Sequence, residues 1–277
     1  MGLLADDPND PVPIAHRARV LEAAWPPDIP DRLTFLESRC RGRSLLDVGC
    51  VAHAEARLES DEWLHGRLAR VAARCVGVDI LESGVEAVRA AGFDAVVHDL
   101  RDGLGPLAER GPFDVIVAGE LIEHVPDLDM ILATAAEGLP PDGELILTTP
   151  NPYAPQRVRA GQLGIVWENV DHVSYLFPSG MAELAERRGL VLAQAATIAR
   201  RPRPGATATQ RLKRRFAGAT GAMSAAEPWA VRARHSSTRA RSPDPCADSF
   251  DRGRASSVRR LSMSSATVRD GASVPLP

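Results

Sequence analysis

Residues that can do chemistry stand directly after the short apolar runs of this sequence. A carboxylate accepts hydrogen bonds from sugar hydroxyls and amines, and a glycine lets the backbone approach a ligand closely. A single acidic residue after a strand often only caps the next helix. Asp79 and Asp99 follow two successive runs, and Gly49 follows the run before them, so helix capping alone explains the combination less well. The pattern favours a ligand that carries a ribose. The candidate binding residues that follow from this pattern are Gly49, Cys50, Asp79, Asp99 and Glu120.

Two histidines are candidates for proton transfer, His124 in "ELIEHV" and His172 in "NVDHVSY". Histidine suits a general base because its imidazole titrates near neutral pH. The alternatives are that His124 ties its loop to the backbone at a helix start, and that His172 belongs to a substrate lid and moves no proton. Glu123 could orient His124 or favour the start of the next helix. His53 and His65 are too scattered for a metal site, so we assign them structural roles and predict no metal.

Alternating strands and helices must position these residues. Almost wholly apolar runs predict buried strands, and apolar residues at helical spacing predict amphipathic helices. The predicted strands span residues 43–50, 75–80, 93–100, 113–120, 143–150 and 190–199. The predicted helices span residues 54–74, 81–92, 127–138 and 178–189. This alternation predicts a doubly wound α/β fold with a parallel sheet, whose ligand crevice lies at the carboxyl ends of the strands.

Several segments carry a family resemblance: "LLDVGC", "CVGVDI", "HDL", "FDVIVAGELIEHVPDLDMIL" and "LPPDGELILTTPN". Together they resemble the class I S-adenosylmethionine-dependent methyltransferases, above all the branch with the ubiquinone-biosynthesis-type enzymes. The resemblance covers roughly residues 40–200, and residues 113–151 are its most specific part because two strands, a helix and their loops follow in the family's order. It implies a Rossmann-like fold of the class I type, with S-adenosyl-L-methionine as cofactor.

The resemblance also implies a role for each matched position in the first two strands and their loops. Asp47 and Gly49, with Cys50, would shape the loop that faces the methionine part of the cofactor. Asp79, followed by Ile80, would hold the ribose.

The later matched positions would complete the site. Asp99 with Leu100 would flank the adenine, and Glu120 would lie beside the sulfonium end of the cofactor. The implied activity is in-line methyl transfer to a small molecule or to a glycan or lipid precursor, with His124 or His172 as a possible general base.

The first loop departs from the family's pattern. The usual loop is acidic-x-Gly-x-Gly-x-Gly, whereas here it is Asp47-x-Gly49-x-Val51-x-His53. Extra glycines allow close backbone approach, so their loss bears on cofactor affinity. S-adenosylmethionine has no pyrophosphate and needs fewer bare backbone N–H groups than a dinucleotide does. We therefore interpret the loop as a variant of the family's loop and not as a degraded one.

Other functional classes fit the sequence less well. An oxidoreductase is disfavoured because there is no GxGxxG and Asp79 follows Gly49 by 30 positions, against roughly 20 in a dinucleotide fingerprint. A non-catalytic relative that binds a nucleotide-like ligand or a protein partner stays open because of the variant loop. An RNA methyltransferase that uses the basic C-terminal region as an arm is the third alternative, with steep salt dependence as its mark.

Charge divides the 277-residue chain into two parts. Residues 201–277 carry 15 basic and 5 acidic residues, although the whole chain has a net charge of −3. The remaining acidic body argues against nucleic acid as a partner. The four cysteines show no CxxC spacing, and neither a secretory signal nor a membrane span is evident, which predicts a cytoplasmic protein. Oligomeric state is not predicted.

We expect three regions: an N-terminal extension at 1–30 with at most one short helix near residues 15–25, a methyltransferase-like domain at 31–200, and a basic tail rich in Arg, Ser and Pro at 201–277. The composition of the tail predicts that it is mostly disordered. No apolar run follows Ala199, so the last antiparallel strand of this fold type is possibly missing. We hypothesise that the native end is lost after about Trp229, which would leave an exposed sheet edge.

Overall fold

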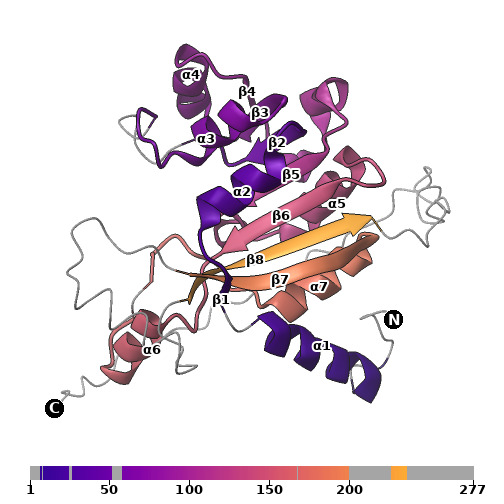
Figure 1. Cartoon of the computed structure of the whole chain (residues 1–277), viewed down its shortest axis with the longest axis vertical. Coiled ribbons are helices and arrows are strands. Elements are labelled where there is room, and N and C mark those ends of the chain that lie inside the picture. The colour runs from indigo at the N-terminus through magenta and orange to yellow at the C-terminus, as the bar shows by residue number, and fades with distance from the viewer. Residues whose placement is uncertain are drawn as a thin grey trace, which may run out of the picture. The chain divides into compact units, whose positions relative to one another are not determined.

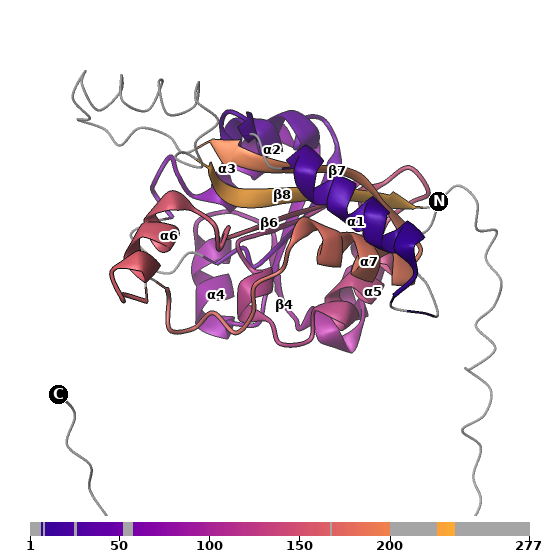
Figure 2. The same ribbon diagram turned by 90° about the horizontal axis from the view of Figure 1, so that it is seen from below.

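The computed structural model describes residues 7, 9–24, 27–51, 58–166, 168–199 and 226–235. The chain divides into two units, residues 1–239 and 240–277, and every described residue belongs to the first. That unit is built around one mixed β-sheet with helices on both faces (Figures 1 and 2). No helix within these ranges is long and apolar enough to cross a bilayer.

The sheet has eight strands in the order β1-β7-β8-β6-β5-β2-β3-β4. Neighbouring strands are parallel except around β8, which runs antiparallel to both β6 and β7. The carboxyl ends of β2 to β5 therefore meet at one edge, and the predicted doubly wound fold is confirmed. The strands are β1 (Pro27–Ile29), β2 (Ser44–Val48), β3 (Arg74–Asp79), β4 (Ala95–Val97), β5 (Val115–Gly119), β6 (Glu144–Thr149), β7 (Leu190–Ala199) and β8 (Ala226–His235).

Helices cover both faces of this sheet (Figure 2). Helices α2, α3 and α4 lie on one face, α5 and α7 lie on the other, and α1 packs against α7. The α-helices are α1 (Pro11–Ala24), α2 (Arg32–Cys40), α3 (Leu64–Val71), α4 (Glu82–Ala90), α5 (Leu128–Gly138), α6 (Pro155–Gln162) and α7 (Pro178–Arg187). Short 3-10 helices are η2 (Leu100–Asp102), η3 (Gly105–Arg110) and η4 (Ile122–His124).

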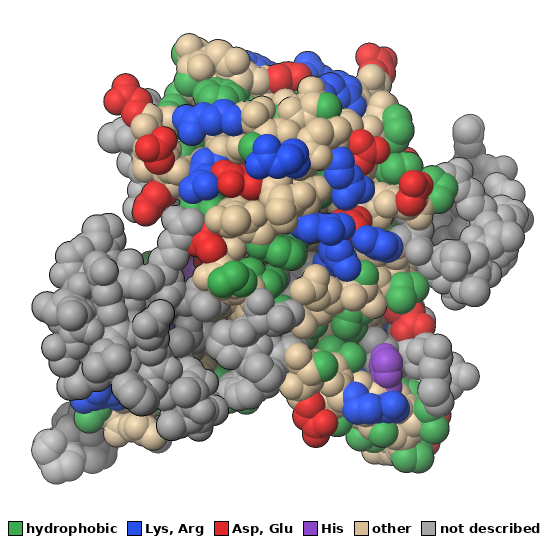
Figure 3. Space-filling view, viewed as in Figure 1, with side chains coloured by type: hydrophobic (Ala, Val, Ile, Leu, Met, Phe, Trp, Pro, Cys, Tyr) green, Lys and Arg blue, Asp and Glu red, His purple; other side chains and the backbone are tan. Residues whose placement is uncertain are grey.

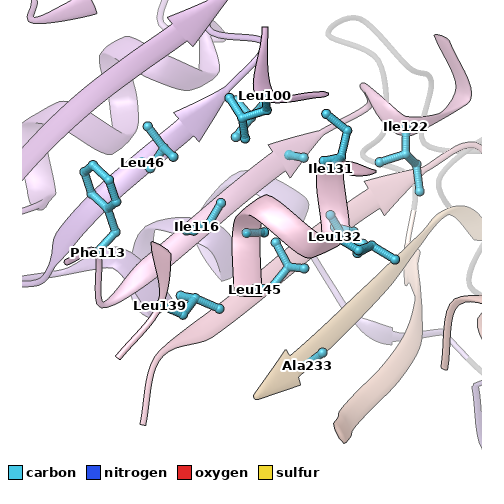
Figure 4. Packing of buried hydrophobic residues seen from close by; sticks show 14 of the residues in the cluster. Leu46, Leu100, Phe113, Ile116, Ile122, Ile131, Leu132, Leu139, Leu145 and Ala233 are labelled. Atoms are coloured by element: carbon cyan, nitrogen blue, oxygen red, sulfur yellow. The ribbon is translucent and has the colours of Figure 1, made fainter. Parts of the chain in front are cut away.

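The largest hydrophobic core lies between the sheet and α5 (Figure 4). Leu46, Ile116 and Leu145 stand side by side on three adjacent strands and point to this face. Leu132 of α5 packs with them and is fully buried. Burying a leucine or isoleucine stabilises the fold by roughly 1.5–3 kcal/mol. This core fixes the strands whose ends carry the candidate residues.

The structure corrects our expectation about the last strand. We predicted that the antiparallel strand is possibly missing and that the native end is lost after about Trp229, but β8 runs from Ala226 to His235 and pairs on both sides. The prediction was wrong because this segment alternates apolar residues with arginines, so it lacks an apolar run. Residues 200–225 and 236–277 lie outside the described residues, so disorder of the tail stays a prediction there.

Other elements differ from the prediction near the N-terminus. Helix α1 lies where we allowed one short helix in the extension, but it begins earlier, at Pro11; strand β1, which pairs with β7, was not predicted. The predicted helix at 54–74 is described only as α3, with turns at residues 58–62 before it. Helix α2 was not predicted; Asp31 caps it by accepting a hydrogen bond from the backbone N of Thr34 at 2.8 Å.

Candidate functional site

A cavity opens at the carboxyl ends of β2, β3, β4 and β5. The structure brings together in its lining the predicted residues Gly49, Asp79, Ile80, Asp99, Leu100 and His124. The other lining residues are Val48, Val78, His98, Arg101, Leu121, Val125, Pro126 and Ile131. The remaining candidates, Asp47, Cys50, Glu120 and His172, lie outside the lining.

Gly49 makes the turn that leaves β2. Its φ of 77° lies in the left-handed region, and its backbone N donates to the carbonyl of Val78 at 2.8 Å. A Cβ atom here would stand 3.0 Å from Cδ1 of Leu121, which lines the cavity. Both the backbone conformation and the close approach therefore require glycine at this position.

Asp79 stands at the end of β3 and organises the adjacent loops. Its Oδ2 accepts a hydrogen bond from the backbone N of Val51 at 3.1 Å, and its Oδ1 accepts from the N of Leu81 at 3.1 Å. Each carboxylate oxygen has two lone pairs, so both can accept a further hydrogen bond from a ligand. The next residue, Ile80, is 61% exposed and offers apolar surface at the cavity.

Asp99 is held by Arg101, a neighbour that the sequence analysis did not single out. Nε of Arg101 lies 2.9 Å from Oδ2 of Asp99, and the backbone N of Arg101 donates to Oδ1. Hydrogen bonding from Arg101 lowers the pKa of Asp99, which keeps the carboxylate charged. Leu100 is buried, and its carbonyl accepts from Thr134 Oγ1 at 2.7 Å. The spacing of two residues in "DLR" is the signal that could have revealed this pair.

Asp47 is buried beneath the loop that it was predicted to shape. Its Oδ2 lies 3.0 Å from Nδ1 of His65 on α3, and both side chains are almost fully buried. Gly77 on the neighbouring strand makes room for this pair, since a Cβ there would stand 2.9 Å from the His65 ring and 2.6 Å from Sγ of Cys50. Cys50 is buried too, and its carbonyl accepts a hydrogen bond from Trp63 Nε1. The buried side chains of Asp47, His65 and Cys50 therefore pack beneath the loop after β2 and do not face the cavity.

Glu120 follows β5 in a conformation that is rare for residues with a side chain. Its φ is 57°, and its backbone N donates to the carbonyl of Thr148 at 2.8 Å. Its Oε2 pairs with Nη1 of Arg32 at 2.8 Å. A residue in the left-handed region costs about 1–2 kcal/mol, so the surrounding contacts must hold it.

Val51, which stands where the family's loop has a glycine, packs into a space next to Gly84 of α4. A Cβ atom on Gly84 would stand only 2.3 Å from Cγ1 of Val51. The extra bulk in the loop is therefore accommodated by a glycine in the facing helix. This fit supports a variant loop in preference to a degraded one.

Replacing Gly84 with alanine is expected to lower the free energy of unfolding by about 1–3 kcal/mol, because the new methyl group collides with Val51. A helical glycine-to-alanine change normally stabilises by about 0.5–1 kcal/mol. Gly180 of α7 has open space around it, so Gly180→Ala is the matched control with the opposite sign. Chemical denaturation measures both, and adding Val51→Gly should restore the stability of Gly84→Ala. Equal stabilisation by both alanines would contradict the proposed fit.

The two candidate histidines lie together. Their ring centroids are 4.7 Å apart, with an interplanar angle of 78°. Nδ1 of His124 lies 3.3 Å from Oδ2 of Asp171, and Nδ1 of His172 lies 2.5 Å from Oε1 of Glu168. His124 lines the cavity, whereas His172 lies outside the lining, and its side chain is 4% exposed. This arrangement gives His124 the direct access to a ligand.

Glu123 completes this group from a buried position. Its Oε2 accepts a hydrogen bond from Thr149 Oγ1 at 3.0 Å, and burial raises its pKa to about 7. Glu123, His124 and His172 each offer one ligand atom, and these atoms lie within 4.8 Å of one another. We predicted no metal site, but carboxylate and imidazole groups at this spacing could hold a divalent cation.

Replacing Glu123 with glutamine is expected to remove a pH dependence of stability. Because the folded pKa of about 7 exceeds the ordinary 4.5, the folded state keeps a proton that the unfolded state loses, so stability falls as pH rises from about 4.5 to 7. The loss is on the order of 3 kcal/mol for the wild type and absent in Glu123→Gln, which keeps an acceptor for Thr149. Denaturation midpoints in EDTA across this range measure it, with Glu137→Gln on the exposed side of α5 as control. Parallel pH profiles in all three proteins would contradict the prediction.

Comparison with known sequences matches residues 16–195 to a family described as a methyltransferase domain. A ubiquinone biosynthesis O-methyltransferase of Idiomarina loihiensis is 29% identical over 194 residues, covering 62% of this chain and 71% of that protein. The protein of the same name from Hahella chejuensis is 32% identical over 147 residues, covering 50% of this chain and 58% of that protein. The match to this second relative thus spans little more than half of its length.

Among solved structures, a SAM dependent methyltransferase from Archaeoglobus fulgidus superposes with a TM-score of 0.48 at 14% identity, covering 80% of this chain and 93% of that one. The magnesium protoporphyrin IX methyltransferase of Synechocystis, with bound SAH, also gives a TM-score of 0.48 at 15% identity, covering 84% and 91%.

Proposed function

The chain belongs to the class I S-adenosylmethionine-dependent methyltransferases, and from this premise we propose that it methylates a hydroxyl oxygen of a small molecule. The observation that supports this most is a cavity whose lining joins Asp79 and Asp99 to His124. The relatives named as O-methyltransferases of ubiquinone biosynthesis support an oxygen acceptor on an aromatic or lipid-like precursor.

In this proposal the residues at the strand ends would hold the cofactor. Asp79 would accept hydrogen bonds from the ribose hydroxyls, and Ile80 would pack against the adenine ring. Asp99, kept charged by Arg101, would accept from the exocyclic amine. The backbone at Gly49 would approach the methionine part. Carboxylates that accept from sugar hydroxyls are typical of doubly wound nucleotide sites.

The reaction is an in-line displacement at the methyl carbon. When bound, the cofactor would supply an activated methyl group: the acceptor oxygen would bond to the methyl carbon as the carbon–sulfur bond breaks, with S-adenosylhomocysteine as the leaving group that keeps the electron pair. The hydroxyl proton goes to His124. A proton on Nδ1, shared with Asp171, leaves Nε2 as the basic nitrogen. Positioning supplies most of the rate, and the base adds to it.

The grouping of Glu123, His124 and His172 favours a second possible role for the histidines. A divalent cation held there would lower the pKa of the acceptor hydroxyl in place of a base. The two roles differ in one measurable respect, because a chelator abolishes activity only if a cation is needed.

The test is calorimetric titration of S-adenosylmethionine into the full chain, followed by mass spectrometry of a catechol acceptor incubated with and without EDTA. Micromolar cofactor binding and a methylated catechol support the proposal. Activity that survives EDTA supports the base role of His124. A folded protein that binds no cofactor would contradict the proposal and favour the non-catalytic alternative.

A further inference from the structure

Four arginines surround one buried carboxylate at the opposite end of the sheet from the cavity. Glu144 begins β6 and is 1% exposed. Arg39 comes from α2, Arg43 from the turn before β2, and Arg232 and Arg234 from β8. Ion pairs join each of the four guanidinium groups to Glu144. We call these five residues the arginine cluster.

Strand register explains why these side chains meet. Arg234 pairs with Glu144 across the antiparallel ladder, and Arg232 pairs with Ile146. Directly opposite residues of a ladder share a face, so both arginines point to the face covered by α2, where Arg39 lies near the end of the helix. Figure 3 shows Lys and Arg side chains gathered over the β6–β8 part of the sheet on this face.

Glu144 does not need all four arginines. Arg39 donates from Nε to its Oε2 at 3.0 Å, and Nη2 of Arg39 and Nη2 of Arg234 also donate to the carboxylate. Arg43 stands at 3.4 Å and uses Nη2 for the carbonyl of Asp114. Arg232 stands at 3.6 Å, beyond hydrogen-bond distance. Arg39 and Arg234 therefore satisfy the hydrogen-bonding capacity of the Glu144 carboxylate. Arg43 and Arg232 add positive charge without donating a hydrogen bond to it.

The cluster carries an excess of positive charge. Within the described residues, Glu144 is the one carboxylate within ion-pair distance of the four arginines, so three positive charges are left over. Nε of Arg232 is buried and has no hydrogen-bond partner in the described part of the chain. Burial lowers the pKa of Arg232 in spite of Glu144, and Arg39, Arg234 and Arg43 lower it further. Such crowding of like charges is costly unless an anion joins them.

We propose that the arginine cluster is a binding site for a small phosphate-bearing anion. A phosphate group carries about 1.5–2 negative charges near pH 7 and presents several acceptor oxygens, so it would offset much of the surplus charge and suit the planar forks of the guanidinium groups. The arginine side chains are between 17% and 46% exposed, so an anion can reach them from solvent. The site stands at the amino end of β6, away from the cavity, and its occupancy does not require methyl transfer.

Thermal denaturation of the full chain in phosphate and in chloride, at equal ionic strength and pH, tests the proposal. We expect phosphate to raise the Tm of the wild type by a few degrees more than chloride does, and Arg232→Gln to lose this increment. Arg188→Gln, which removes an arginine paired with Asp129 on the other face, should keep it. In low-salt buffer without phosphate, Arg232→Gln should melt at or above the wild-type Tm, because repulsion is relieved.

Calorimetry with inorganic phosphate gives a second readout, with at least tenfold weaker binding expected for Arg232→Gln. Arg43→Gln serves in its place if Arg232→Gln does not fold, because both arginines add charge beyond what Glu144 needs. A phosphate effect that is absent in the wild type, or retained in both variants, would overturn the proposal and reduce the cluster to charge neutralisation of Glu144. Sedimentation with phosphatidylglycerol vesicles that depends on Arg232, without any effect of free phosphate, would also overturn it and favour a membrane headgroup.

Discussion

Asp79→Ala is expected to weaken the binding of S-adenosylmethionine by at least roughly 100-fold. Hydrogen bonds to a charged acceptor contribute about 1.5–3 kcal/mol each, and two ribose hydroxyls would lose theirs. The same carboxylate holds the backbone N of Val51 and of Leu81, so its removal also releases the loop after β2 and the approach to α4. Calorimetric titration of the full chain measures the loss.

Two variants separate this effect from general damage. Asp79→Asn keeps one acceptor oxygen, so its affinity for the cofactor should fall only about tenfold. The hydrogen bonds that remain are to a neutral acceptor and are weaker than those to a carboxylate. Asp94→Ala removes an exposed aspartate that pairs with Arg110 outside the cavity, and should bind cofactor as the wild type does. If Asp79→Ala, with an unchanged circular dichroism spectrum, bound as tightly as Asp94→Ala, the assignment of Asp79 to the ribose would be rejected.

His124→Gln is expected to lower kcat by about 10²–10⁴-fold and to leave cofactor binding little changed. The imidazole lines the cavity and pairs through Nδ1 with Asp171, so glutamine keeps a polar side chain but cannot take up the proton. Steady-state rates with a catechol acceptor, together with calorimetric titration of the cofactor, provide the measurement.

The neighbouring histidine distinguishes a base from a metal ligand. The His172 ring contacts that of His124, lies outside the cavity lining and pairs with Glu168, so His172→Gln should lower kcat less than His124→Gln does if His124 is the base. His16→Gln on α1 is the control for loss of a histidine elsewhere. Equal losses in both variants, together with full inhibition by EDTA, would assign the pair to a divalent cation held with Glu123.

The central strands could be predicted because each of them is buried on both faces. Segments such as Leu145–Leu147 and Val115–Ala118 are apolar without interruption, and helices cover them from both sides. Strand β8 was missed because Arg232 and Arg234 interrupt its apolar residues. Their side chains share a face with Glu144, which lies 90 residues away from Arg234 in the sequence, and no local pattern reveals such a partner. The period-two alternation with Val231 and Ala233 was the signal that could have found the strand.

The sequence was enough to place the candidate site at the carboxyl ends of the strands. In a parallel sheet these ends lie at one edge, and this does not depend on which side chains the strands carry. Asp79 and Asp99 therefore line the cavity together. The partner of a side chain depends on tertiary packing, which is why neither the pairing of Asp47 with His65 nor that of Glu120 with Arg32 was foreseen. The compensation between Val51 and Gly84 was hidden for the same reason.

The position of β8 inside the sheet sets the order in which a newly synthesised chain completes its fold. β8 separates β6 from β7, so β6 keeps an open edge until His235 has left the ribosome. A premature stop after Trp229 would leave only Thr149 of β6 with a partner from this strand. Open strand edges recruit other chains, so such a product is expected to aggregate during translation. The emergence of β8, and not that of the cofactor loop, therefore closes the open edge of β6.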